Sequence, residues 1–527
     1  MPKRQDFAYG ALILSISGFL VKLIGAIFKI PLTNLVGAAA MSYFTSAYSI
    51  YNLLLALATS GLPTGIAAMI SKAIAVEHYK DIKKILKIAA GIFVTVGAVL
   101  SIFGFIFAEQ IAVKMNSEEA YWSVAAIMPA IFCISVVSVF KGYFQGYKNM
   151  APTATSNLIE AAVKLIAGYG IAWVMFQSGY PKEQVVGGAV LGVSISTIVA
   201  MLYMILRYVF RNKEYRVSLK TFVNDKETPT RQLTAEFLTI SFPIIISSVT
   251  SNLMSTVDAF LVMDRLKTYV PLDTAKLLWG AYGNLALTIF NLPSFLIIAI
   301  GISLIPAISS SYAKKDIATV NITINKAMRY SSILAFACAF GLYAVSNRTL
   351  LLFFPGDPEG VQAATPLLEI ISFALIAVGL TNITSAVLQA IGKAYLPVIS
   401  VAVGAGVKTI STFILVSIPS INVSGAPIAT NIAYPIMLIL NLWFIYKNLK
   451  ILPNFMDVFV KPLISGIVCF IAAKVGFLIF DTFLPQKISL FAVILCAMLS
   501  YFAFILLIKL VTIDEIKGIL AKNKNNP

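Results

Sequence analysis

Lysine side chains that could bind a ligand stand inside the long apolar segments of this sequence. Lys22 and Lys29 lie seven residues apart in the first segment, so two turns of helix would place them on one face. A charged side chain at the centre of a bilayer costs about 2.5 to 3.5 kcal/mol and usually faces the protein interior or a water-filled cavity. The pair therefore predicts a site for an anionic ligand. The alternative is that both side chains extend to the membrane interfaces or pair with carboxylates.

Later segments add charges of both signs. Glu160 and Lys164 have the spacing of an intrahelical ion pair, which is the structural alternative to a role in binding. Lys408 is a further cationic candidate. Asp258 ends a polar face and would either bind a coupling cation or pair with a lysine.

Neutral amides form a third group. Asn284 and Asn291 lie on one helical stripe, which suits hydroxyl-rich ligands or packing between helices. A cavity lined by all these groups would carry excess positive charge and would favour phosphate or pyrophosphate. The residues predicted to bind substrate are Lys22, Lys29, Lys164, Lys408, Asn284 and Asn291, and the candidates for cation coupling are Asp258 and Glu160.

Catalytic and metal-binding patterns are not predicted. His78 is the only histidine, and the four cysteines have no paired spacing. The phosphate-binding motif of nucleotide hydrolases does not occur, so transport would use an ion gradient, of Na⁺ or H⁺, or the membrane potential. We expect no enzyme, no metal site and no resident cofactor. A sugar-transferring membrane enzyme is the weaker alternative.

Membrane helices must position these side chains. The 527 residues are 59% hydrophobic and 12% charged with a mean hydropathy of +0.88, whereas soluble domains are about a quarter charged. We predict an all-α polytopic membrane protein with 14 transmembrane helices. The predicted spans are 7-36, 41-72, 85-108, 121-141, 151-176, 185-209, 235-263, 279-309, 327-347, 364-391, 397-418, 425-447, 462-481 and 488-511.

The net charge of +17 is spread over short loops on alternate sides of these spans. Most Lys and Arg residues fall on one side, which predicts cytoplasmic N- and C-termini by the positive-inside rule. Contact with anionic lipid headgroups follows, and nucleic-acid binding does not.

An internal repeat divides the chain into halves. Residues 141–164 align without a gap to residues 385–408, so that Gln145 meets Gln389 and Lys164 meets Lys408. Duplicated halves are a common plan of transporters, with substrate near the midplane. We predict two pseudo-symmetric six-helix lobes plus two C-terminal helices. The predicted parts are an N-terminal lobe at 1-215, a cytoplasmic linker at 216-234, a C-terminal lobe at 235-450, and the last two spans with a tail at 451-527.

The segments KGYFQGYKNMAPTATSNLIEAAVKLIAGYG, TSNLMSTVDAFLV and AVLQAIGKAYLPV carry a family resemblance. The chain resembles the bacterial polysaccharide-biosynthesis branch of the multidrug/oligosaccharidyl-lipid/polysaccharide (MOP) flippases. Within it, the chain is most similar to the MurJ-type lipid II flippases of Gram-positive bacteria and the stage V sporulation protein B family. The resemblance covers nearly the whole chain, although the fourteen-span layout is shared with drug antiporters of the MATE type.

The resemblance implies a flippase in the bacterial cytoplasmic membrane that moves undecaprenyl-pyrophosphate-linked sugars, with lipid II for peptidoglycan as the expected cargo, by alternating access. The family's cationic pair corresponds to Lys22 and Lys29 here, and Asp258 becomes a candidate for cation coupling. The family's charged positions in spans two and eight fall near Tyr43, Leu55 and Thr288 and are not assigned as sites. Candidate partners are the lipid-linked oligosaccharide, membrane lipids and cell-wall synthesis proteins. Alternative cargoes are another lipid-linked polysaccharide unit or, by cation coupling, drugs.

Overall fold

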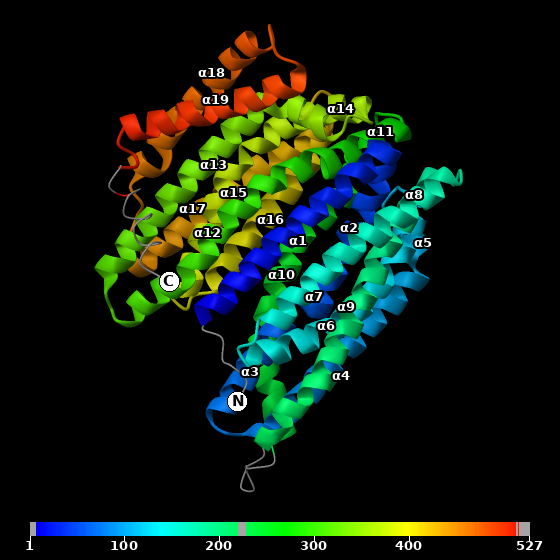
Figure 1. The fold of residues 1–527 in the computed structure, drawn as a ribbon, viewed down its shortest axis with the longest axis vertical. Coiled ribbons are helices and arrows are strands. Elements are labelled where there is room, and N and C mark those ends of the chain that lie inside the picture. The colour runs from blue at the N-terminus through cyan, green and yellow to red at the C-terminus, as the bar shows by residue number, and fades with distance from the viewer. Residues whose placement is uncertain (1–6, 220–227, 513–514, 516–527) are drawn as a thin grey trace. The chain divides into compact units, whose positions relative to one another are not determined.

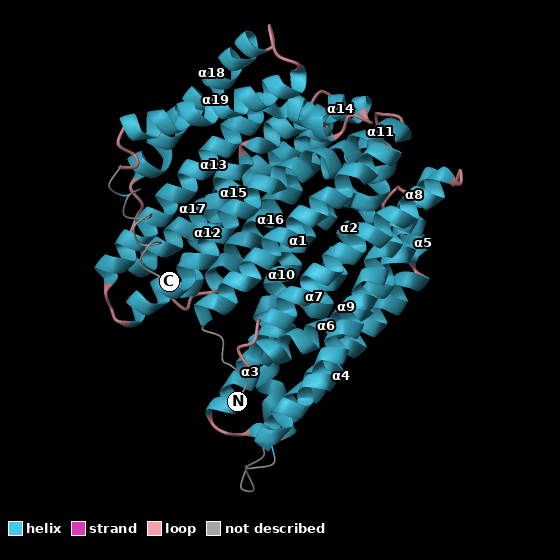
Figure 2. Ribbon diagram, viewed as in Figure 1, coloured by secondary structure: helices cyan, strands magenta, loops and turns pink. Residues whose placement is uncertain are grey.

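The computed structural model describes residues 7–219, 228–512 and 515, and every element in this part of the chain is a helix (Figures 1 and 2). Contacts divide the chain into two compact units, Met1–Asn284 (unit 1) and Leu285–Pro527 (unit 2). The α-helices of unit 1 are α1 Phe7–Val36, α2 Ala38–Thr59, α3 Leu62–Ala75, α4 Tyr79–Ile106, α5 Ala108–Lys114, α6 Tyr121–Gly146, α7 Ala151–Val163, α8 Tyr169–Gln177, α9 Lys182–Leu219, α10 Thr230–Leu266 and α11 Leu272–Gly280.

Unit 2 is helical in the same way. Its α-helices are α12 Leu287–Ala313, α13 Ile317–Phe353, α14 Pro358–Ser372, α15 Ala374–Ala390, α16 Tyr395–Val416, α17 Gly425–Leu449, α18 Lys461–Phe480 and α19 Gln486–Leu507. Short 3₁₀ turns are η1 Glu118–Ala120 and η4 Asn422–Ser424, and π-helical segments are η2 Lys164–Gly168, η3 Ala281–Ala286 and η5 Met456–Val460.

The helices have the length and composition of membrane spans. Twelve helical segments among the described residues are long and apolar enough to cross a bilayer, and the pair α14 and α15, bent by 44°, raises the number to as many as 13. Helix α12, which corresponds to the eighth predicted span, contains side chains outside the described residues. The all-α polytopic membrane fold is confirmed, and the number fourteen stays a prediction.

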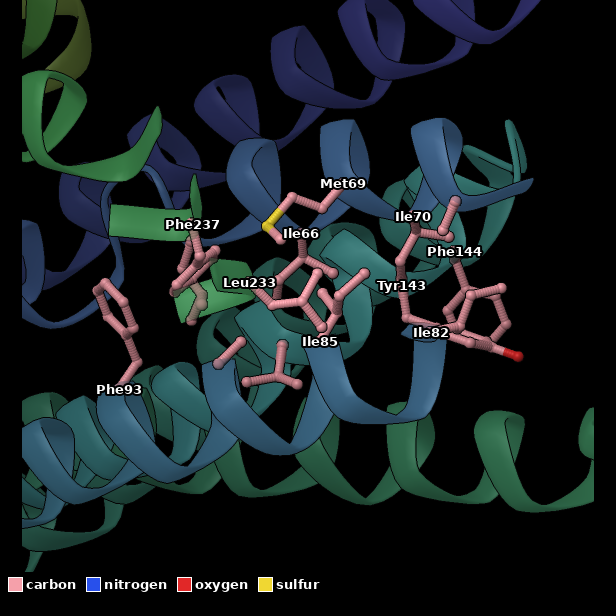
Figure 3. Close-up of a cluster of buried hydrophobic side chains, with 14 of the residues drawn as sticks. Ile66, Met69, Ile70, Ile82, Ile85, Phe93, Tyr143, Phe144, Leu233 and Phe237 are labelled. Atoms are coloured by element: carbon pink, nitrogen blue, oxygen red, sulfur yellow. The ribbon is translucent and has the colours of Figure 1, made fainter. Parts of the chain in front are cut away.

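A buried cluster holds one end of unit 1 together (Figure 3). Ile82, Ile85 and Phe93 recur at helical spacing on α4, so they form one apolar face that meets side chains of α3, α6 and α10. On α6, a Cβ atom at Gly142 or Gly146 would lie 2.7 Å from Ile66 or Ile70 of α3. The two glycines, four residues apart, therefore let α3 and α6 approach closely.

The C-terminal part of the predicted linker, from Thr228, is hydrogen-bonded to the start of α4. Thr228 donates from its backbone N–H to Asp81 Oδ1 at 3.0 Å and from its hydroxyl to Asp81 Oδ2 at 2.5 Å. Asp81 is buried at the start of α4. These bonds fix the chain just before α10, whereas residues 220–227 of the predicted linker lie outside the described residues.

Helices α10 and α11 pack on α2 and so belong to unit 1, although they follow the linker. Ser241 on α10 donates to the Gly61 carbonyl at 3.3 Å, and Thr256 donates to the Ser49 carbonyl at 3.0 Å. The boundary between the two compact units thus falls after Asn284. The predicted lobes, which follow the sequence repeat, stay a prediction.

Unit 2 has two buried clusters of its own. One joins α12, α13, α15 and α17, and the other joins α13 to the adjacent pair α18 and α19. Tyr501 on α19 donates its hydroxyl to the Ile333 carbonyl on α13 at 2.6 Å. The last two helices are therefore tied to α13 by a buried hydrogen bond as well as by apolar packing.

Candidate functional site

Three lysines of the predicted site gather within unit 1. Lys22 and Lys29 lie on α1, and Lys164 begins η2, directly after α7, against which α1 packs. Lys22 and Lys164 both act electrostatically on Lys29, and Lys22 acts on Lys164. We call these three residues the lysine cluster. Like charges repel one another, so neighbouring groups must stabilise their positions.

Aromatic rings provide part of that stabilisation. Lys29 Nζ lies 5.3 Å from the ring centroid of Phe44 on α2, and Lys164 Nζ lies 5.9 Å from that of Phe28 on α1. An ammonium group over an aromatic face is attracted by the ring quadrupole. Lys29 and Lys164 are half-buried, whereas Lys22 is exposed. Lys22 is therefore the member most open to a ligand.

A row of rings continues from the lysine cluster along α2. Phe28 and Phe44 have centroids 6.1 Å apart, Phe44 stacks on Tyr48 at 4.3 Å, and Tyr48 meets Tyr51 edge-on at 5.7 Å. Glu160 on α7 acts electrostatically on both tyrosines and on Lys164. One carboxylate thus interacts with Lys164 of the lysine cluster, close to a buried aromatic wall.

The backbone at Lys164 is also unusual. Helix α7 passes into the π-helix η2 at this residue, and π-helical turns occur often at functional sites. Within η2, Gly168 packs so tightly on α9 that a Cβ atom at Gly192 would lie 2.3 Å from its Cα. This contact holds η2, including the backbone of Lys164, against α9.

The two remaining predicted residues of unit 1 lie on or after α10. Asp258 is buried on α10. Asn284 in η3 is fully buried and donates its amide to the Met41 carbonyl at 2.7 Å and to the Thr45 hydroxyl. That geometry corresponds to the helix-packing alternative for Asn284.

Unit 2 contains the other two predicted residues. Asn291 is exposed on α12. Lys408 is buried on α16, on the same helical face as Ser400, Gly404 and Thr412. The structure therefore brings Lys22, Lys29, Lys164 and Glu160 together and places Asn291 and Lys408 in the other unit.

Two lysines outside the predicted set have distinctive surroundings. One is Lys141 on α6, on which Glu160 acts electrostatically. The other is Lys276 on α11, whose Nζ donates to Glu119 Oε1 at 2.5 Å and lies 5.6 Å from the ring centroid of Tyr43. Both stand near helix ends, where a sequence pattern does not distinguish them from surface lysines.

The Lys276 ion pair is asymmetric in burial. The Lys276 side chain is 6% exposed, whereas that of Glu119 is 38% exposed. Burial alone would lower the pKa of Lys276, but the hydrogen bond to Glu119 and the neighbouring Tyr43 raise it above its ordinary value. The ammonium group is thus kept charged where α11 docks on α2.

We expect Glu119→Ala to destabilise the protein more than Lys276→Met. The first change leaves a buried ammonium group without its carboxylate, at about 1–3 kcal/mol. The second leaves a partly exposed carboxylate that water can solvate, at under about 1 kcal/mol. Thermal unfolding of the purified variants measures the difference. Equal losses, or a double variant no more stable than Glu119→Ala, would contradict this account.

Among the residues that the structure describes, no group of three or more His, Cys, Asp or Glu side chains could hold a metal ion. What the lysine cluster can do is bind an anion through several point charges.

Two proteins of Bacillus subtilis are similar to this chain over most of its length. Stage V sporulation protein B of Bacillus subtilis is 23% identical over 98% of this chain and 98% of its own length. Lipid II flippase MurJ of the same organism is 22% identical over 81% of this chain and 80% of its own.

Solved structures show the same fold. Lipid II flippase MurJ in an inward closed conformation matches with a TM-score of 0.71 at 16% identity, covering 94% of this chain and 98% of that chain. An inward-facing multidrug resistance MATE family transporter of the MOP superfamily matches with a TM-score of 0.65 at 14% identity, covering 84% and 99%.

Family models agree with these similarities. The MatE model matches residues 243–414. The model described as polysaccharide biosynthesis protein matches residues 7–312, which is more than half of the chain and includes the whole lysine cluster. The chain therefore belongs to the polysaccharide biosynthesis protein family, with the fold of MurJ.

Proposed function

We propose that this protein is a flippase for an undecaprenyl-pyrophosphate-linked sugar precursor, with lipid II as the expected cargo. It would move the precursor from the inner to the outer leaflet of the bacterial cytoplasmic membrane by alternating access, with both termini in the cytoplasm. The observation that carries the proposal is the lysine cluster, because three cations gathered inside a membrane-spanning unit suit a pyrophosphate. Similarity to lipid II flippase MurJ supports the same class of cargo.

The chemistry of the step is binding and release rather than bond breaking. Lysine ammonium groups act as point charges toward phosphate oxygens, and their attraction strengthens where water is excluded. The lipid tail can stay in the bilayer while the charged head group crosses inside the protein. Asp258 is the candidate group for coupling this movement to Na⁺ or H⁺, and the membrane potential is the alternative source of energy.

A drug exporter is the second candidate function, favoured by the match of residues 243–414 to the MatE model. Exporters of cationic drugs need acidic groups at the binding site, since lysines repel such cargo. The lysine cluster therefore favours the anionic lipid. Asp258→Asn distinguishes the two functions, because it should reduce export of a cationic dye only if the exporter assignment is correct.

The test is translocation by the purified protein in liposomes. A polyprenyl-pyrophosphate disaccharide carrying a nitrobenzoxadiazole label is incorporated, and external dithionite bleaches the label that reaches the outer leaflet. We expect the protein to make inner-leaflet label accessible, while a labelled phosphatidylcholine stays protected. Transport of ethidium without lipid movement would establish the exporter instead. Formation of a new glycosidic bond would establish an enzyme, and movement of both lipids would show unselective scrambling.

A further inference from the structure

The register of α6 against α7 brings Lys141 toward Glu160. These consecutive helices are joined by a short connection, and Gln145 Nε2 on α6 donates to Thr153 Oγ1 on α7 at 3.4 Å. Lys141 lies one turn back from Gln145, while Glu160 lies two turns beyond Thr153. Antiparallel helices run past each other in this order, so Lys141 and Glu160 lie at neighbouring levels of α6 and α7. The electrostatic interaction of Glu160 with Lys141 agrees with this register.

Glu160 has a second cation on its own helix. Lys164 follows four residues later, at the spacing at which side chains of a helix meet, and Glu160 acts on it electrostatically. A single carboxylate therefore stands between two lysines, Lys141 on α6 and Lys164 at the start of η2. A small coupling cation entering here would meet two positive charges, so the surroundings disfavour a cation site at Glu160.

The internal repeat provides independent support. At the offset that aligns Lys164 with Lys408, Lys141 aligns with Ser385 and Glu160 aligns with Gly404. The second half thus keeps the repeated lysine while both members of the Lys141 and Glu160 pair are replaced by uncharged residues.

The structure of unit 2 shows what occupies these positions. Ser385 accepts a hydrogen bond from Asn441 at 3.0 Å. A Cβ atom at Gly404 would lie 2.3 Å from Met437, so no carboxylate side chain fits there without movement. Two charges that compensate each other are expected to be present together or absent together, which is the pattern of the two halves.

We propose that Glu160 is a positioning residue that compensates Lys141 and thereby limits the positive charge acting on the ligand of the lysine cluster. Together Lys22, Lys29, Lys164 and Lys141 carry four positive charges, and Glu160 reduces them to three. This balance lets a pyrophosphate bind through Lys164 and still be released. This inference rests on the proposed function. It assigns to Glu160 the role of adjusting the net charge of the binding site, in place of the predicted role in cation coupling.

The test compares Glu160→Gln with two double variants in the liposome assay described above, over a range of labelled lipid concentrations. One extra charge at the cluster should lower both KM and turnover roughly tenfold for the single variant, because the lipid is bound more tightly and released more slowly. Lys141→Gln added to Glu160→Gln should return both values toward those of the unaltered protein. Lys164→Gln added to Glu160→Gln should not, because it removes a ligand-binding group.

The outcomes separate this inference from the proposed function. If the unaltered protein moves no labelled lipid, the proposed function fails. If the unaltered protein moves the lipid but Lys141→Gln does not rescue Glu160→Gln, the inference about Glu160 fails while the proposed function stands. The same holds if Glu160→Gln abolishes the dependence of lipid translocation on Na⁺ or H⁺. Thermal unfolding without lipid of the unaltered protein, Lys141→Gln, Glu160→Gln and their double variant gives a second reading. Non-additive shifts are expected for Glu160 with Lys141, and additive shifts would overturn the pairing even where the single variant folds poorly.

Discussion

Gly280→Val should prevent α11 from docking on α2 and remove almost all folded protein. A Cβ atom at Gly280 would lie 1.7 Å from the Ala38 carbonyl oxygen and 2.6 Å from its carbon. Overpacking costs about 1–3 kcal/mol where side chains can move aside. Here the obstacle is backbone, so the helices themselves would have to separate. Thermal unfolding followed by size-exclusion chromatography of the purified variant measures the loss.

Gly170→Val is the matched control. Gly170 is also a helical glycine, on α8, but a Cβ atom there would have no heavy atom within 4 Å. Both variants therefore change helix propensity in the same way, but only Gly280→Val creates a steric clash with the backbone of α2. Equal stability of the two variants would show that α11 does not need this close approach.

Lys22→Ala should lower the rate of lipid translocation by roughly tenfold or more while the amount of folded protein stays normal. Lys22 is the exposed member of the lysine cluster, so its removal leaves no cavity in the packed interior. A hydrogen bond to a charged group contributes about 1.5–3 kcal/mol, which corresponds to about one to two orders of magnitude in binding. The liposome assay with labelled polyprenyl-pyrophosphate disaccharide measures the rate, and chromatography measures the folded amount.

Lys474→Ala provides the comparison for charge alone. Lys474 is an exposed lysine on α18, with its Nζ 5.6 Å from the ring centroid of Phe470. It lies in unit 2, whereas the lysine cluster lies in unit 1. We expect translocation to continue in this variant. Full activity of Lys22→Ala would return Lys22 to the alternative in which it only extends to the membrane interface.

Most helices were predictable because hydropathy is a local property. The first span, predicted at 7-36, is α1 Phe7–Val36, and the predicted 151-176 corresponds to the run from α7 to the end of α8. Less predictable were the interruptions within spans. The second predicted span, 41-72, is divided between α2 and α3 at Gly61, which adopts a left-handed φ of 77°.

The candidate site was predictable only in its components. The seven-residue spacing placed Lys22 and Lys29 on one face of α1, but it did not show that Lys29 lies over Phe44 of α2. Lys141 was missed because it stands near the end of α6, where a lysine usually reaches the membrane interface. The available signal was the repeat, in which Lys141 and Glu160 are replaced together.

The sequence by itself determined that this is an all-α membrane protein with a duplicated segment and cations within its spans, because apolar length and the position of charges can be read along the chain. Only the tertiary structure decided which charges meet. Glu160 acts on Lys141 because of the register between α6 and α7, and Asn284 donates to the Met41 carbonyl because α11 and η3 turn back onto α2. Helix rotation and register depend on contacts between distant residues, and the repeating pattern of one helix does not contain them.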